Sequence, residues 1–139
     1  MPVHVTHRDL ARSFTRLLES AEVTADQVSH LLRFYAVECG LKAAALRRRN
    51  LQRTDQLPGD LLSHDLRRLA KELRLTPAAY QRLVDCRRVA AANAIHPPVA
   101  VPQLHEAWRY GAGLDASSER SCVAGLVSLG QWCRKELGR

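Results

Sequence analysis

The chain has few aromatic residues and no long apolar run. Phe, Trp and Tyr together make up 5% of its 139 residues, whereas Ala and Leu are abundant. Sheets are enriched in aromatic and β-branched residues, while Ala and Leu are strong helix formers, so the composition favours packed helices over sheets. No apolar run approaches the length that crosses a bilayer, and we expect no membrane association. A chain of this size predicts one domain, residues 1–139.

The N-terminus lacks the features of a targeting sequence. Its first residues, MPVHVTHRDLARSF, contain no apolar core of the kind found in a signal peptide, so we expect a soluble, cytoplasmic protein. Cysteines in that compartment stay reduced. The four cysteines here show no CxxC pair and no zinc-type spacing. We therefore predict buried thiols, and neither a metal nor another cofactor. The thiols are Cys39, Cys86, Cys122 and Cys133.

Acidic residues are outnumbered by basic ones. The chain has 21 Lys and Arg against 14 Asp and Glu, which gives a formal net charge of +7 and a pI of about 9.8. Such a charge permits binding to RNA, DNA or another anionic partner. Solvated helix faces are the other interpretation of the same charges. The candidates for nucleic-acid binding in the densest basic stretch are Arg47, Arg48, Arg49, Arg67 and Arg68.

Apolar periodicity predicts an all-α fold, an antiparallel bundle of four main helices and one short helical segment. The first helix is expected at 8–20. The second is expected to reach about residue 49, with Thr24 and Gln27 forming a capping box at its start. The loop 50–63 contains Pro and Gly and few apolar residues.

Ser63 is then expected to cap a third helix, with Asp65 in its first turn. Thr76 and Pro77 are expected to begin a fourth main helix that ends near Asn93. The segment 96–102 contains three prolines and is expected to be irregular. The remaining expected elements are a short helix at 104–110 and a last helix from about residue 117, with Cys122, Leu126, Leu129 and Cys133 facing inward.

A charged pair occupies the apolar face of the second expected helix. Glu38 and Lys42 are four residues apart, in the order that favours an intrahelical ion pair. Charged groups at such a central position are paired or used for function. We predict a buried ion pair, tied to polar groups of a neighbouring helix such as His64.

Two segments resemble the HEPN superfamily of small helical-bundle proteins. They are FYAVECGLKAA at 34–44, followed by SHDLRRL at 63–69. The resemblance implies a homodimer that acts in toxin–antitoxin or antiviral defence. In many members the dimer binds and cleaves RNA without a metal, using an Arg and a His that follows it within a few residues. The Arg would hold the phosphate, and the His would handle the proton of the attacking 2′-hydroxyl.

No His in this chain follows an Arg at the family's usual distance. Arg88 and His96 come nearest, with seven residues between them, and His105 and Arg109 stand in reverse order at helical spacing. These two pairs are the catalytic candidates for a metal-independent endoribonuclease. The supporting candidates are Glu38, Lys42, His64 and Asp65.

Three further interpretations follow from the sequence. Trp108 and Tyr110 flank Arg109 and suit base stacking or a protein interface, or else they close the end of the bundle. The missing Arg–His spacing favours a non-catalytic adaptor that binds a protein encoded nearby. Residues 69–88 are also similar to a helix-turn-helix, in which 80–88 would read DNA and Arg74 would adopt a left-handed conformation.

Overall fold

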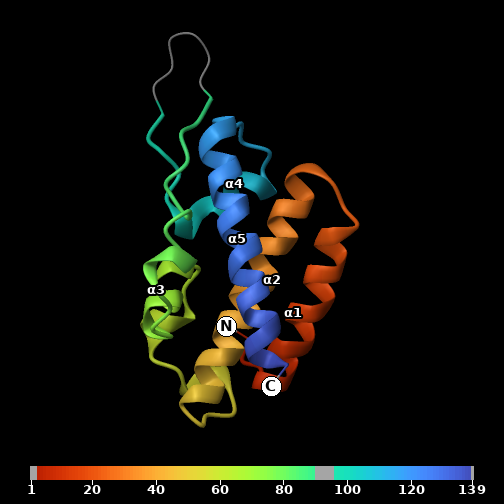
Figure 1. Cartoon of the computed structure of the whole chain (residues 1–139), viewed down its shortest axis with the longest axis vertical. Helices are drawn as coiled ribbons and strands as arrows, with labels where there is room; N and C mark the ends of the chain where they lie inside the picture. The colour runs from red at the N-terminus through yellow and green to blue at the C-terminus, as the bar shows by residue number, and fades with distance from the viewer. Residues whose placement is uncertain (1–2, 90–95, 139) are drawn as a thin grey trace.

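The structure, a computed structural model that describes residues 3–89 and 96–138, is built from helices (Figure 1). Its α-helices are α1 (His7–Glu22), α2 (Asp26–Arg48), α3 (Leu66–Glu72), α4 (Leu104–Arg109) and α5 (Ala116–Leu137). Short 3-10 turns lie at Thr54–Gln56, Gly59–Leu62, Pro77–Ala79 and Val101–Gln103. Within the described ranges no strand forms, and only isolated β-bridges occur. The all-α prediction is confirmed.

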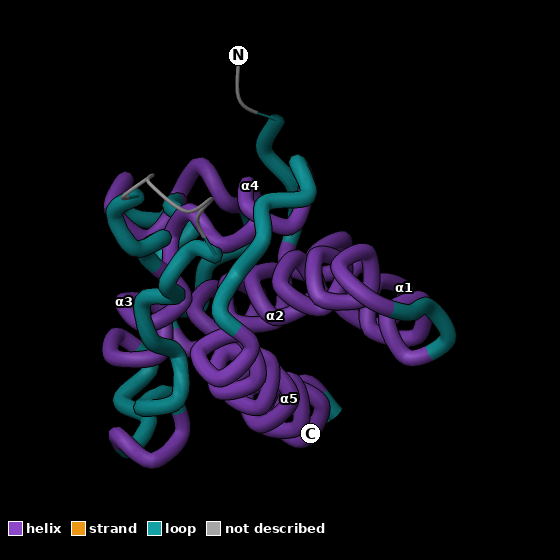
Figure 2. Tube along the Cα trace, turned by 90° about the horizontal axis from the view of Figure 1, so that it is seen from above, coloured by secondary structure: helices purple, strands orange, loops and turns teal. Residues whose placement is uncertain are grey.

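The central helix is α2, and each of the other α-helices packs against it (Figure 2). Phe34, Val37, Leu41 and Leu46 of α2 have no exposed surface. The buried apolar residues of all the α-helices belong to one continuous core. None of the described helices combines the length and the apolar character needed to cross a membrane.

Gly40 sets how closely α1, α2 and α5 approach one another. A Cβ atom at this position would lie 2.8 Å from the Cys133 Sγ atom of α5 and 2.9 Å from the Phe14 Cδ1 atom of α1. Real Cβ atoms do not make contacts that short, so the three helices pack this tightly only because residue 40 has no side chain.

The predicted helix starts are partly wrong because neighbouring backbone groups compete for the same side chains. The Thr24 hydroxyl donates to the Ser20 carbonyl at the end of α1, and Ala25 becomes the N-cap of α2 without a side-chain bond. Asp65 caps α3 by accepting from the Arg68 amide at 3.2 Å, so it precedes the helix. The Ser63 hydroxyl instead accepts from the Asp65 amide.

The fourth main helix is absent from residues 80–89, and the part of the prediction at 90–93 lies outside the described residues. Thr76 and Pro77 do begin a helical turn, but it ends at Ala79. Side chains of α5 then satisfy the backbone beyond it, because Ser121 donates to the Arg82 carbonyl and the Cys122 Sγ accepts from the Val84 amide. The backbone of Cys86 pairs with that of Val99. These tertiary partners replace the hydrogen bonds of a helix.

The rest of the bundle agrees with the sequence. The short helix appears as α4, and α5 begins at Ala116, one residue from its expected start. The inward stripe of α5 has no exposed surface. The described structure therefore has three long helices, α1, α2 and α5, and two short ones, in place of four main helices and one short segment. All four cysteines are free thiols, three of them buried and Cys39 partly so.

Candidate functional site

A buried ion pair lies in the middle of α2. The Lys42 Nζ atom is 3.4 Å from the Glu38 Oε2 atom, and the two side chains are only 10% and 13% exposed. Lys42 also donates to the Leu62 carbonyl at 3.4 Å. The predicted ion pair is confirmed. Because desolvation opposes such a pair, its clearest effect is to hold both side chains in one geometry.

The carboxylate of Glu38 also binds His64, which lies just before α3. The His64 Nδ1 and Glu38 Oε1 atoms are 2.5 Å apart. A carboxylate only accepts, so the His64 Nδ1 atom donates this hydrogen bond. The His64 side chain is 47% exposed, so the imidazole ring is accessible to a substrate. The predicted contact between the ion pair and His64 is present.

A second imidazole, that of His105 in α4, packs against the first. The ring centroids of His64 and His105 are 4.1 Å apart, and the Phe34 ring lies on His105 at 5.4 Å. His105 is buried. Burial lowers the pKa of His105, and the positive charge that His64 gains on protonation lowers this pKa further. His105 is therefore a neutral imidazole near pH 7.

Tyr35 links His105 to an exposed arginine. Its hydroxyl lies 3.4 Å from the His105 Nδ1 atom, and the Arg109 guanidinium donates to the same hydroxyl oxygen. This hydrogen bond raises the pKa of Arg109. The guanidinium also lies over the Tyr35 and Tyr110 rings, 5.9 Å from each centroid. Arg109 is thus a permanent, exposed cation held in a fixed position by aromatic rings.

We call the connected group of polar side chains on α2, α4 and the start of α3 the histidine cluster. It offers an accessible base, a buried neutral imidazole and an exposed cation, a set suited to proton transfer beside a negatively charged group. In the described part of the chain no group of three or more His, Cys, Asp or Glu residues is placed to hold a metal ion. The members of the cluster are Tyr35, Glu38, Lys42, His64, His105 and Arg109.

Five of these six residues are candidates from the sequence, and Tyr35 is the one that the sequence analysis does not single out. A signal was present, because Tyr35, Glu38 and Lys42 follow one another at spacings of three and four and so share one side of a helix. Asp65 lies next to the cluster in sequence, but its carboxylate caps α3.

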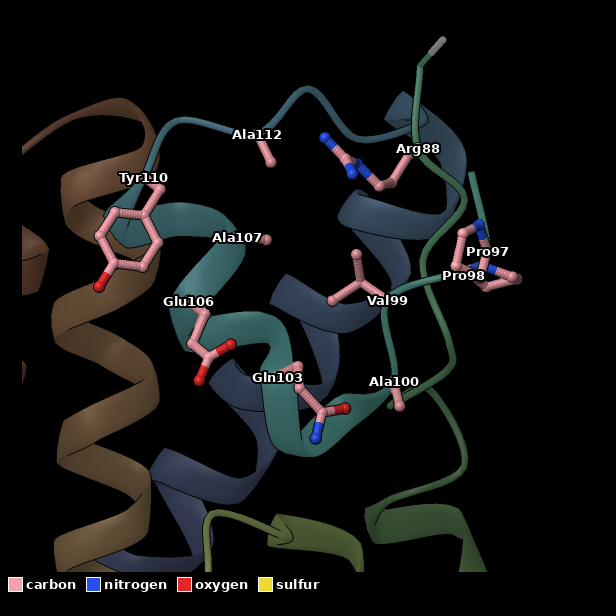
Figure 3. Close-up of a pocket in the computed structure, with 10 residues that line it drawn as sticks. All are labelled: Arg88, Pro97, Pro98, Val99, Ala100, Gln103, Glu106, Ala107, Tyr110 and Ala112. Atoms are coloured by element: carbon pink, nitrogen blue, oxygen red, sulfur yellow. The ribbon is translucent and has the colours of Figure 1, made fainter. Parts of the chain in front are cut away.

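The other candidate pair, Arg88 and His96, is not part of the histidine cluster. Both residues are exposed, on the two irregular segments that pair through Cys86 and Val99. Arg88 lines a mainly apolar pocket of about 340 Å³, opposite Tyr110 (Figure 3). Neither histidine of the cluster lines this pocket. The structure therefore favours His105 with Arg109 over Arg88 with His96 as a chemical site.

The arginines at the end of α2 bind acceptors within the chain. Arg47 donates to the Glu136 carbonyl, Arg48 contacts the Glu136 carboxylate, and Arg49 contacts Glu72. They lie at the end of α2 remote from α4 (Figure 1). These contacts tie α2 to α5 and α3 at a place away from the histidine cluster.

The two aromatic candidates have opposite environments. Trp108 is only 3% exposed, packs on Phe34, and donates to the Glu119 carboxylate at 3.0 Å. This burial favours the second of the two interpretations, in which Trp108 closes the end of the bundle. Tyr110 is 76% exposed and available for contact. Arg67 and Arg68 lie on α3, close behind His64 in sequence.

Comparison of the chain with protein-family models, with curated proteins and with solved structures finds no match. The functional argument therefore depends on the geometry of the chain's own side chains.

Proposed function

We propose that this protein binds RNA and cleaves it without a metal at the histidine cluster. The observation that carries the proposal is that the His64 and His105 rings contact each other, and that the exposed guanidinium of Arg109 is tied to His105 through the Tyr35 hydroxyl. Cleavage of RNA through its 2′-hydroxyl needs a base for one proton and a cation for the phosphate, and this cluster supplies both.

In the proposed reaction, His64 Nε2 takes the proton of the 2′-hydroxyl. The 2′-oxygen forms a bond to phosphorus while the bond from phosphorus to the 5′-oxygen breaks, and the departing 5′-oxygen takes up a proton from water. The products are a 2′,3′-cyclic phosphate and a free 5′-hydroxyl. Arg109 binds the phosphate oxygens and stabilises the charge that develops on them.

The remaining members of the cluster position these two groups. Glu38 orients the His64 ring through its bond to Nδ1, and Lys42 holds Glu38 in place. Tyr35 and His105 hold Arg109 beside the imidazoles. The proposal thus assigns chemistry to the two exposed side chains and orientation to the buried ones.

The DNA-binding alternative has less support. Arg74 does adopt a left-handed conformation, with φ of 57°. However, residues 80–88, the segment that would enter the major groove, do not form a helix. No recognition helix is therefore available at that position.

The proposal also includes an HEPN-like homodimer acting in a defence or toxin–antitoxin setting. Its support is that the residues carrying the resemblance, Glu38, Lys42 and His64, contact one another in three dimensions. A dimer is expected to show twice the 15.6 kDa mass of one chain in light scattering. A mass of one chain at micromolar concentration would contradict it.

The cleavage test uses labelled tRNA and a DNA strand of matching sequence, each with and without a chelator. We expect metal-independent cleavage of RNA alone, because DNA lacks the 2′-hydroxyl. His64→Ala and Arg109→Ala should each lower the rate at least about 100-fold. The matched controls are His96→Ala and Arg88→Ala, which remove the same residue types outside the cluster and should leave the rate unchanged.

Intact RNA with every preparation would contradict the catalytic proposal. Co-purification with the product of a neighbouring gene would then favour the non-catalytic adaptor. Equal losses in the cluster variants and in the controls would instead indicate that cleavage does not depend on the histidine cluster.

A further inference from the structure

A basic pocket of about 450 Å³ lies between α3 and the turn at Val101–Gln103 that leads into α4. Figure 1 shows this turn beside α3, and the two elements are in contact. Both walls of the pocket are close in sequence to the histidine cluster, because His64 directly precedes Asp65 on one wall and His105 follows the turn on the other. The charged residues of its lining are Asp65, Arg67, Arg68, Lys71 and Asp85.

Several of these charges are already satisfied within the chain. Arg68 forms an ion pair with Asp60, and Asp65 caps α3. The other cations are Arg67 and Lys71, which are four residues apart and therefore lie on one side of α3. The Lys71 Nζ atom also lies over the Tyr80 ring, 5.9 Å from its centroid. Both cations face the single further carboxylate of Asp85, so the pocket has an excess of positive charge.

Arg67 has a hydrogen-bond donor without an acceptor in the chain. Its Nε atom is shielded from water and has no acceptor. Buried donors without a partner are rare in native proteins and call for an explanation, such as a ligand. An oxyanion would supply the acceptor after a small rotation of the side chain, because a guanidinium can bind two oxygens of one phosphate side by side. Lys71 would add a second, mobile charge to the same anion.

We propose that this pocket binds a phosphate group, and that in the RNA complex it holds the phosphate next to the one at the histidine cluster. The second part of the inference depends on the proposed function, whereas the first part does not. A strand bound in this way spans at least two nucleotides, so the pocket would make a dinucleotide with an added terminal phosphate a better ligand than one without it.

The first experiment measures binding of inorganic pyrophosphate by calorimetry. The variants are Arg67→Gln with Lys71→Gln, which keep polar side chains, and Arg67→Ala with Lys71→Ala. The control is Arg16→Ala with Lys135→Ala, which removes the same charges from exposed positions outside the pocket. We expect both pocket variants to weaken binding about tenfold or more and the control to leave it unchanged. Unchanged binding in the pocket variants, or an equal loss in the control, would overturn the proposal.

The second experiment tests the link to RNA with the dinucleotide UpA, free or carrying a 5′- or 3′-terminal phosphate. Binding is measured in the His64→Ala background, so that no cleavage interferes. A terminal phosphate should tighten binding about tenfold, and Arg67→Gln with Lys71→Gln should abolish that gain.

The outcomes separate this inference from the proposed function. If pyrophosphate binds in the pocket but the terminal phosphate adds nothing, the pocket is a site for free phosphate and its link to RNA is overturned. If both binding experiments succeed and the wild-type protein leaves RNA intact, the phosphate pocket stands and the catalytic proposal fails.

Discussion

The two sides of α2 are packed by different means. On the side of α1 and α5, the helices approach closely at Gly40, where Phe14 and Cys133 meet it. On the side of α3 and α4, the same helix contributes Glu38 and Lys42 to a hydrogen-bonded cluster with two imidazoles.

The two sides of α2 therefore differ in what they contribute: one contributes stability and the other contributes the candidate site. The apolar side gains stability from close packing, which requires no particular orientation of a polar group. The polar side keeps charged groups away from water, which is costly, and it holds them in one geometry. Groups of this kind concentrate at functional sites, so the histidine cluster is the part of the molecule on which function is expected to depend.

The largest expected effect concerns the ion pair on the polar side. Glu38→Gln leaves the Lys42 ammonium buried without its counter-charge, and we expect it to lower the free energy of unfolding by about 3 kcal/mol. Urea denaturation at neutral pH measures this. Adding Lys42→Met to Glu38→Gln should recover most of the loss, because it removes the unpaired charge. Additive losses in the double variant would contradict the pairing.

The next largest effect on the free energy of unfolding is expected on the apolar side, from the addition of one methyl group at residue 40. Gly40→Ala places a Cβ against Cys133 and Phe14, and we expect overpacking to cost about 1–3 kcal/mol, less the gain of up to about 1 kcal/mol in helix propensity. The matched control is Gly130→Ala in α5, where the new Cβ would make ordinary contacts at 3.8 Å and beyond. This control should be neutral or slightly stabilising in urea denaturation. Equal changes in the free energy of unfolding for the two variants would contradict the conclusion that the helices pack more tightly at Gly40 than at Gly130.

A smaller effect is expected in the pH dependence of stability, which His105 on the polar side of α2 should influence. Burial lowers the pKa of His105, so the unfolded chain, with a pKa near 6.5, binds the proton more readily. The stability that neutral His105 provides is complete above about pH 6.5 and is lost as pH falls through the lower, folded-state pKa. The urea midpoint should therefore fall in this range, and it should fall less in His105→Gln. Burial also lowers the pKa of His30, so some slope should remain. If the urea midpoint fell with pH equally in the wild type and in His105→Gln, the role of neutral His105 in stability would be contradicted.

The smallest effect is expected from an exposed ion pair outside both packed sides. Arg49 and Glu72 are 3.2 Å apart, but their side chains are 39% and 38% exposed. Arg49→Ala should change the free energy of unfolding by no more than about 0.5 kcal/mol, because water and salt screen the pair. A loss as large as that of Glu38→Gln would show that burial does not set the importance of ion pairs here.

Helices with a continuous apolar stripe could be predicted from sequence, as α2 and α5 show. The spacing of Glu38 and Lys42 likewise predicted their ion pair, because residues four apart in a helix are neighbours whatever surrounds them. The segment after Ala79 could not be predicted, since side chains of α5 and the backbone of Val99 supply its hydrogen-bond partners. Thr24 bonded backward to Ser20 for a similar reason, because two backbone groups lay within its reach.

The candidate site divides in the same way. The sequence by itself determined that α2 would bury an acid and a base on one face, because periodicity and spacing are properties of the chain. Only the tertiary structure decided that His105 would lie against His64, that Tyr35 would join the cluster, and that Trp108 would be buried. These contacts join residues about 40 to 75 positions apart, and such pairs are set by how the helices pack together, which local propensity does not specify.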